Sequence, residues 1–438
     1  MILALFMFTF QLAVVSSVSA VPLGKRLVLD NGITLIVAER PEVPMIVVDV
    51  LIKAGSVAEP QDKAGLANLI VELLTQGTVN RTATEIAREI DFMGASLSTS
   101  ADYDYAEARL VILKKYTDRG LELLRDIMVN PSFSPNEIGK KVREIQGEII
   151  KNEEDPGWVA KRRFLQIVFK DHPYSRMVIG NKESVMRISR NDIVDFHSNY
   201  YRPNRTIISI AGDINLQEAK DLTNKNFGGW AIKEENEIDI SAPLPLKETI
   251  TIELDRQVTQ ANIILGHLGI TRDNPDYYPL QVMNYILGGG GFSSRLMNVI
   301  RDKKGLAYHV SSHYMSRKYS GYFQVELQTK NPSAKEATEL VLENMERIRT
   351  KPVSDKELED AKSYLIGSLP LKVETDREVA TQMAFLEFYD LGLDYFDKYP
   401  VYIKAVSKED VLSVAKKYLH LDRIAIVIVA NLQEANIN

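Results

Sequence analysis

The sequence contains no cysteine among its 438 residues. Disulfide bonds, cysteine–zinc sites, cysteine nucleophiles and lipid-modified cysteines are therefore excluded. Nothing follows about the redox compartment, because a chain of this length buries enough apolar surface to fold without disulfide bonds. The length also exceeds that of one ordinary domain, so we expect two or more domains.

Basic residues are in the minority: there are 53 Lys and Arg against 59 Asp and Glu, and the formal net charge is -6. Binding to nucleic acid needs an excess of Lys and Arg that displaces counterions from the phosphates. The charge balance therefore argues against a large nucleic-acid surface. The remaining composition, 45% hydrophobic and 26% charged, is that of an ordinary soluble globular protein.

Charge is also missing from the start of the chain. Residues 1–20 carry no charged side chain, are rich in Leu, Phe and Val, and end in Val18-Ser19-Ala20. This small-x-small ending is typical of a signal peptide, so we predict that residues 1–20 are removed during export. A membrane anchor is the alternative, but the apolar run is short for a span. No other segment approaches the ~20 apolar residues that a transmembrane helix needs, so no membrane span is expected after cleavage.

The rest of the chain alternates strand and helix patterns. Asn31-Gly32 separates two apolar, β-branched runs and predicts a β-hairpin. The apolar run over residues 45–52 predicts a buried strand. Further patterns predict helices over residues 64–74 and 134–152, a helix that begins at the capping box Thr82 to Glu85 and ends before Gly94, and a strand over residues 103–113.

An internal repeat organises the chain. Residues 189–212 and 407–430 share Ser, Asp, Tyr and Arg at one constant offset, and both predict a Ser-capped helix followed by an apolar strand. Two copies half a chain apart indicate a duplicated domain rather than a short-period solenoid. Residues 233–247, rich in Glu, Asn and Pro, are typical of a linker. We predict an α+β fold with an N-terminal domain (21–232), this linker and a C-terminal domain (248–438).

The segment over residues 65–74, followed by Gly77-Thr78, resembles the metal-binding helix of the pitrilysin/insulinase family. In that family two histidines four residues apart bind zinc, and a glutamate directly before the second histidine activates water. Here those three positions hold Asn68, Val71 and Glu72, while the flanking residues remain. Valine has no proton-accepting group, so the general base is lost.

The family's third zinc ligand is a glutamate on a later helix. Glu148-Ile149, followed by Glu154-Asp155-Pro156, is similar to that pattern, which implies that Glu148 occupies the ligand position. Together with Asn68 and Glu72 it offers oxygen ligands, which suit calcium or magnesium better than zinc. The alternative is a solvated helix face whose carboxylates meet Lys, Arg or water. We expect no metal and no cofactor in this chain.

Histidine is scarce, and the six histidines do not replace the missing ligands. His309 and His313 are four residues apart, but residues 308–315 predict a strand, in which four residues span ~13 Å. The others are scattered along the chain, and His172 lies in a segment similar to one common in the family and is expected to be structural. A zinc site made from histidines is therefore not predicted.

A second resemblance lies in the C-terminal half. Residues 288–296, with four glycines before Phe-Ser-Ser-Arg-Leu, and residues 300–308 resemble the family's substrate-binding segment. There an arginine and a tyrosine seven residues later hold the substrate near the scissile bond, and Arg301 and Tyr308 match them. A guanidinium donates to carbonyl oxygens, and a phenol can donate to a developing oxyanion. The alternative is an ordinary surface arginine; a phosphate-binding loop is excluded because its Gly-Lys-Ser/Thr ending is absent.

The resemblance spans residues 27–432. It implies two homologous α/β-sandwich halves, each with a mixed, largely antiparallel sheet and helices packed on one side. The two halves would form one half of a clamshell-shaped metallopeptidase. Some exported family members are split into a zinc-bearing subunit and an Arg/Tyr subunit, which close around an unfolded peptide. Such a peptide adds a strand to an exposed sheet edge, for which residues 95–102 are the candidate.

We therefore expect a non-catalytic subunit of an exported, periplasmic zinc peptidase. It would bind extended peptides and contribute Arg301 and Tyr308 to the active site of a partner that carries the zinc, in a heterodimer. One alternative is a stand-alone or homodimeric peptide-binding or scaffolding protein with no proteolytic role. Another is a self-sufficient peptidase that uses Asn68, Glu72 and Glu148, which is disfavoured because no base replaces Val71.

Overall fold

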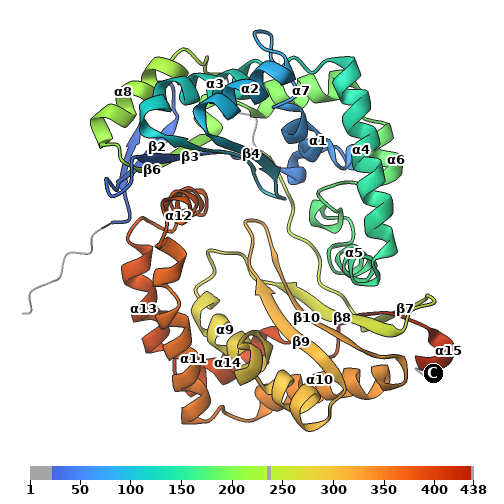
Figure 1. Cartoon of the computed structure of the whole chain (residues 1–438). Coiled ribbons are helices and arrows are strands. Elements are labelled where there is room, and N and C mark those ends of the chain that lie inside the picture. Colours follow the sequence, from blue (N-terminus) through green and yellow to red (C-terminus); the bar gives the residue numbers. More distant parts are fainter. Residues whose placement is uncertain (1–21, 234–237, 436–438) are drawn as a thin grey trace, which may run out of the picture.

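The chain folds into two halves, each centred on a β-sheet, that face each other (Figure 1). The computed structural model describes residues 22–233 and 238–435, and the predicted signal peptide lies outside them. The strand order is β1-β2-β6-β3-β5-β4 in the first sheet and β7-β11-β8-β10-β9 in the second. The β2–β6 and β7–β11 pairs are parallel and the others are antiparallel. The predicted α+β fold with two homologous, largely antiparallel sheets is therefore confirmed.

The two halves have similar element orders, but the first sheet has six strands and the second five. The first sheet is built from β1 (Lys25–Val28), β2 (Thr34–Glu39), β3 (Met45–Ile52), β4 (Ser96–Ala101), β5 (Ala106–Leu113) and β6 (Thr206–Gly212). The second is built from β7 (Ile250–Asp255), β8 (Gln260–Gly269), β9 (Ala307–Met315), β10 (Gly321–Lys330) and β11 (Ala425–Ala430). The helices of the first half are α1 (Leu66–Leu73), α2 (Ala83–Met93), α3 (Thr117–Val129), α4 (Pro135–Glu154), α5 (Pro156–Phe169), α6 (Lys182–Met186), α7 (Arg190–Tyr200) and α8 (Leu216–Phe227). Those of the second half are α9 (Tyr277–Asn284), α10 (Ala334–Thr350), α11 (Asp355–Gly367), α12 (Asp376–Phe388), α13 (Tyr395–Ala405), α14 (Lys408–Tyr418) and α15 (Leu432–Ala435).

Local sequence signals account for many of these elements. β1 and β2 pair antiparallel around the predicted Asn-Gly turn, where Gly32 has a φ of 86°. The capping box between Thr82 and Glu85 starts α2. The strand predicted over residues 103–113 begins later, at Ala106, because residues 102–105 form the turn between β4 and β5. Among the described residues, no helix has both the length and the apolar character needed to cross a membrane.

The internal repeat is confirmed by the structure. Helices α7 and α14 both begin at a serine, Ser189 or Ser407, whose side chain and a following aspartate form a capping box. Each is followed by an apolar strand, β6 or β11, that lies inside its sheet and is buried along its whole length. The two halves therefore repeat the same supersecondary unit. Residues 238–249, in the predicted linker region, form neither helix nor strand.

Each half also contributes one helix that packs on the sheet of the other half. The own helices of the first half pack on one face of its sheet, but α12 covers the opposite face, where Val379, Met383 and Phe388 meet Ile36 and Val47 (Figure 1). Helix α5 of the first half packs in the same way on β8 and β11 of the second sheet. The predicted packing of helices on one side of each sheet therefore holds only for the helices that belong to the same half as the sheet. Strands that are apolar on both faces need a cover on both faces, and the exchanged helices supply it.

A buried polar junction joins the halves where the β9–β10 turn meets the β4–β5 turn. Arg317 donates a hydrogen bond to Asp102 at 2.5 Å, and its guanidinium lies 4.4 Å from the ring centroid of Tyr103. Asp104 is buried and accepts hydrogen bonds from Tyr174 and from the backbone N–H of Lys318. Burial raises the pKa of Asp104, although Tyr174 and Arg317 oppose this. The junction depends on charges from both halves.

Candidate functional site

Helix α1, which carries the positions of the resembled zinc motif, is anchored at its start. Gly65 precedes it with a φ of 99°, and a Cβ there would lie 2.8 Å from the carbonyl oxygen of Ile179. The carboxylate of Glu59 accepts hydrogen bonds from the N–H groups of Gly65 (3.2 Å) and Ala67 (2.7 Å). Burial nevertheless raises the pKa of Glu59 to about 8, with these bonds and Arg176 acting in the opposite direction. Backbone packing therefore accounts for the glycine at position 65 without any metal.

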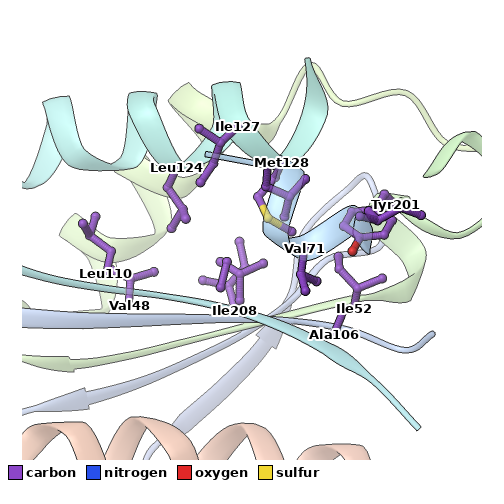
Figure 2. Packing of buried hydrophobic residues seen from close by; sticks show 14 of the residues in the cluster. Val48, Ile52, Val71, Ala106, Leu110, Leu124, Ile127, Met128, Tyr201 and Ile208 are labelled. Carbon is purple, nitrogen blue, oxygen red and sulfur yellow. The ribbon is translucent and has the colours of Figure 1, made fainter. Parts of the chain in front are cut away.

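Val71 is part of the hydrophobic core. Its side chain is 1% exposed and belongs to the cluster between the first sheet and its helices. Figure 2 shows it close to Ile52, Met128 and Tyr201. Its carbonyl oxygen accepts a hydrogen bond from the hydroxyl of Thr99 on β4, at 2.9 Å. The position that the resemblance assigns to a general base is thus occupied by a packed apolar side chain.

The remaining motif positions do not assemble a ligand set. Asn68 is half-buried, and Glu72 is paired with Lys141 of α4, whose Nζ lies 3.3 Å from the glutamate oxygen. Glu148 is exposed on α4. Over residues 22–233 and 238–435 no group of three His, Asp or Glu residues is arranged to hold a metal ion. The ion pair with Lys141 gives Glu72 a structural role.

Tyr201 yields a stability prediction in this region. It is 3% exposed, and its hydroxyl has no hydrogen-bond partner in the described part of the chain. Because an unsatisfied buried hydroxyl costs free energy, Tyr201→Phe is expected to raise the free energy of unfolding by about 1 kcal/mol. Urea unfolding measures the change. Tyr174→Phe is the matched control, because its hydroxyl donates to Asp104, and it should destabilise; a loss of stability in Tyr201→Phe would contradict the prediction.

The structure brings Arg301 and Tyr308 together at the surface. Arg301 lies on the helical segment Met297–Lys303, and Tyr308 lies at the start of β9. The guanidinium carbon is 5.5 Å from the ring centroid of Tyr308 and 4.7 Å from that of Phe292. Tyr308 is 85% exposed and Phe292 70%. A cation near aromatic faces is stabilised and held in position, so the three side chains form one exposed cluster, called here the Arg301 cluster.

The guanidinium of Arg301 has few hydrogen-bond partners within the described part of the chain. The only hydrogen-bond partner of the Arg301 guanidinium among the described residues is the carboxylate of its exposed neighbour Asp302, at 3.3 Å. Arg295, in the same segment, forms an ion pair with Glu357 at 2.6 Å. Sequence reasoning missed Phe292, although its place in the glycine-rich segment next to the matched residues was a usable signal. The cluster can offer guanidinium and phenol donors to a ligand's carbonyl groups.

The glycine run serves packing. A Cβ on Gly288 would lie 2.6 Å from the hydroxyl oxygen and 2.7 Å from the backbone nitrogen of Ser312 on β9. Gly291 has a φ of 55° and Gly305 one of 64°, at the two ends of the loop and helix that carry the arginine. The glycines therefore let this segment approach β9 closely and turn sharply.

The two sheets have four edge strands, β1 and β4 in the first and β7 and β9 in the second. β4 is the last strand of the first sheet, as predicted for residues 95–102, and β9 is the last strand of the second. The hydrogen bond from Thr99 to the Val71 carbonyl ties β4 to helix α1. His309 and His313 lie on β9, as predicted, while His172 is buried and accepts a hydrogen bond from the N–H of Tyr174.

Comparisons with known proteins agree with this architecture. Residues 35–182 match the family model "Insulinase (Peptidase family M16)", and residues 187–365 match "Peptidase M16 inactive domain". The chain is similar to the "Non-peptidase homolog YmxG" of Helicobacter pylori, with 26% identity over 97% of this chain and 98% of the relative. It is also similar to the "Uncharacterized zinc protease YmxG" of Bacillus subtilis, with 27% identity over 80% of this chain and 85% of the relative.

Solved structures share the fold. A peptidase M16 inactive domain from Pseudomonas fluorescens has a TM-score of 0.87 and 25% identity, covering 93% of this chain and 98% of that one. A protease from Helicobacter pylori has a TM-score of 0.87 and 23% identity, covering 93% of this chain and 100% of that one. The likeness thus extends over nearly the whole chain.

Proposed function

Because the chain belongs to the insulinase family (peptidase family M16) as an inactive homologue of its peptidases, we propose that it is the substrate-binding subunit of an exported zinc peptidase. The proposal rests on the contrast between the position of the lost general base and the Arg301–Tyr308 pair. The base position is a core valine, Val71. Tyr308, in contrast, is exposed, and the partly exposed guanidinium of Arg301 lies beside it with Asp302 as its hydrogen-bond partner.

The proposed role divides the chemistry between two chains. The partner, a family member with the intact zinc motif, supplies the metal and the base. This chain supplies donors from the Arg301 cluster to carbonyl oxygens of an extended peptide near the scissile bond. The edges β4 and β9 are suited to pair with varied peptides, since edge pairing reads the backbone. The apolar leader over residues 1–20 supports export, which we place in the periplasm.

The test is reconstitution. The mature chain is assayed for zinc and for peptide hydrolysis, alone and together with a family member that carries the intact motif. Alone it is expected to be free of zinc and inert, and the mixture should cleave peptides. Arg301→Ala should lower that cleavage by about tenfold or more, because it removes donors that act on the substrate. Tyr308→Phe should act in the same direction.

Arg88→Ala, an exposed arginine on α2, is the control and should leave cleavage unchanged. Hydrolysis by the chain alone with a bound metal would contradict the proposal, and so would a mixture whose activity does not exceed that of the partner.

A second candidate is a stand-alone or homodimeric peptide-binding protein. The ion pair between Glu72 and Lys141 favours this candidate, because it gives a residue at a former ligand position a role in joining α1 to α4. One relative is also named a non-peptidase homolog. Light scattering separates the two: a stable complex with the zinc-bearing family member favours the subunit, and peptide binding without any such complex favours the stand-alone protein.

A further inference from the structure

A cavity of about 320 Å³ lies between α5 and the face of the second sheet on which α5 packs. Its wall is mostly apolar, with Ile263 and Ile264 of β8 and Leu327 of β10. Lys161 of α5, Glu326 of β10 and His309 of β9 also line it. His309 directly follows Tyr308 in β9, so the cavity begins one residue from the proposed substrate-binding pair.

Lys161 faces this cavity without a direct carboxylate partner among the described residues. Its ammonium donates to the hydroxyl of Tyr322 at 3.0 Å and to the side-chain oxygen of Gln324. It also lies over the rings of Phe164 and Tyr322, 5.6 Å and 4.2 Å from their centroids. An ammonium has three donors, and only two are used by these neutral acceptors. One donor is thus left beside the cavity.

The acid nearest to this lysine is already engaged. Glu326 accepts from Gln324 at 3.0 Å and lies 3.3 Å from Nε2 of His313. Ser311 contacts the same Nε2 at 3.0 Å. A Ser-His-Glu relay needs the serine and the acid on different ring nitrogens, so this group is not a nucleophilic triad. Its arrangement instead keeps the Glu326 carboxylate occupied and leaves the Lys161 ammonium to an incoming group.

We propose that this cavity binds a carboxylate of the extended peptide, either an acidic side chain or the peptide's C-terminal carboxylate, through Lys161. The inference rests on the proposed function in one respect, that the ligands are peptides held near Tyr308. A largely apolar wall that carries the Lys161 donor, with Glu326 already engaged by Gln324 and His313, fits a ligand carried on an aliphatic stem. A charge-assisted hydrogen bond in such a site is strong.

The electrostatics agree with the geometry. Burial lowers the pKa of Lys161 to about 7, while Glu326 raises it and Arg317 lowers it. The other titratable groups that face the lysine or line its surroundings are Tyr322, His309 and His313. A bound carboxylate would favour the charged form of the lysine. Because a lysine is charged below its pKa, the preference for a carboxylate should weaken as the pH rises through about 7.

The test uses fluorescence anisotropy with the mature chain and matched labelled peptides. One pair differs only by Glu or Gln at a single position, and a second pair differs only by a free or amidated C-terminus, so the two sources of carboxylate are separated. In one pair the carboxylate peptide should bind about tenfold more tightly than its neutral counterpart. Lys161→Met should abolish this ratio, and Lys161→Arg, which keeps the charge, should retain it.

Lys151→Met, an exposed lysine on α4, is the control and should leave the ratio unchanged. The ratio should also fall between about pH 6 and about pH 8.5 in the wild type, but not in Lys161→Met. Peptide binding without any carboxylate preference, or a preference that survives Lys161→Met, would overturn the proposal. If Arg301→Ala loses peptide binding while Lys161→Met keeps the ratio, the cavity proposal is rejected and the proposed function stands. If Arg301→Ala keeps peptide binding while Lys161→Met loses the ratio, only the proposed function is rejected.

Discussion

Val71→Glu is expected to lower the free energy of unfolding by about 3–5 kcal/mol, because it places a carboxyl group in an apolar core. The side chain is 1% exposed, and no described cation lies free beside it, since Lys141 is engaged with Glu72 and Glu144. Helix α1 cannot easily rotate the new group outward. Glu59 holds the start of the helix, and Thr99 holds the carbonyl of residue 71.

Urea unfolding of the mature chain measures this effect. Val79→Glu is the matched control, because Val79 is 72% exposed and the same change there should shift stability by less than about 0.5 kcal/mol. Equal effects at both positions would contradict the placement of Val71 in the core. The expected result has a functional meaning: the base position cannot be refilled without rebuilding the core around it.

Arg317→Met is expected to cost about 3–5 kcal/mol, since it removes the cation from a buried junction and leaves its acids uncompensated. Arg317 is bound to Asp102, and burial already raises the pKa of the neighbouring Asp104. A carboxyl whose folded-state pKa is raised takes up a proton on folding, so stability from this group falls as the pH rises. Loss of the cation strengthens that trend. The deficit of the variant should therefore be larger at neutral pH than under mildly acidic conditions.

Arg349→Met provides the comparison, because Arg349 pairs with Glu346 one turn away on the same helix and is partly exposed. That change should cost less than about 0.5 kcal/mol. Unfolding is followed by far-UV circular dichroism and by the fluorescence of Trp230 in the first half and of Trp158 on α5, which packs on the second sheet. A junction variant as stable as the wild type, at every pH, would show that Arg317 does not join the halves.

Sequence alone determined the features that depend on near neighbours along the chain. The Asn31-Gly32 hairpin and the capped starts of α2 and α7 follow from local hydrogen bonds and backbone preferences. The repeat was visible because its two copies keep the same local pattern. The loss of histidines and glutamate at Asn68, Val71 and Glu72 was likewise a matter of reading residue types.

Only the tertiary structure decided what those local elements contact. The exchange of α5 and α12, the packing of Val71, and the approach of Phe292 to Arg301 all join segments by surface shape and burial. The lysine-lined cavity arises in the same way, because Lys161 and Gln324 meet across the two halves. Periodicity shows that a face is apolar but not which distant face covers it, since burial is non-directional and many partners would satisfy it. The sequence therefore determined the elements and the missing chemistry. The packing of the two halves decided where Arg301 and Tyr308 lie and which neutral groups the Lys161 ammonium contacts.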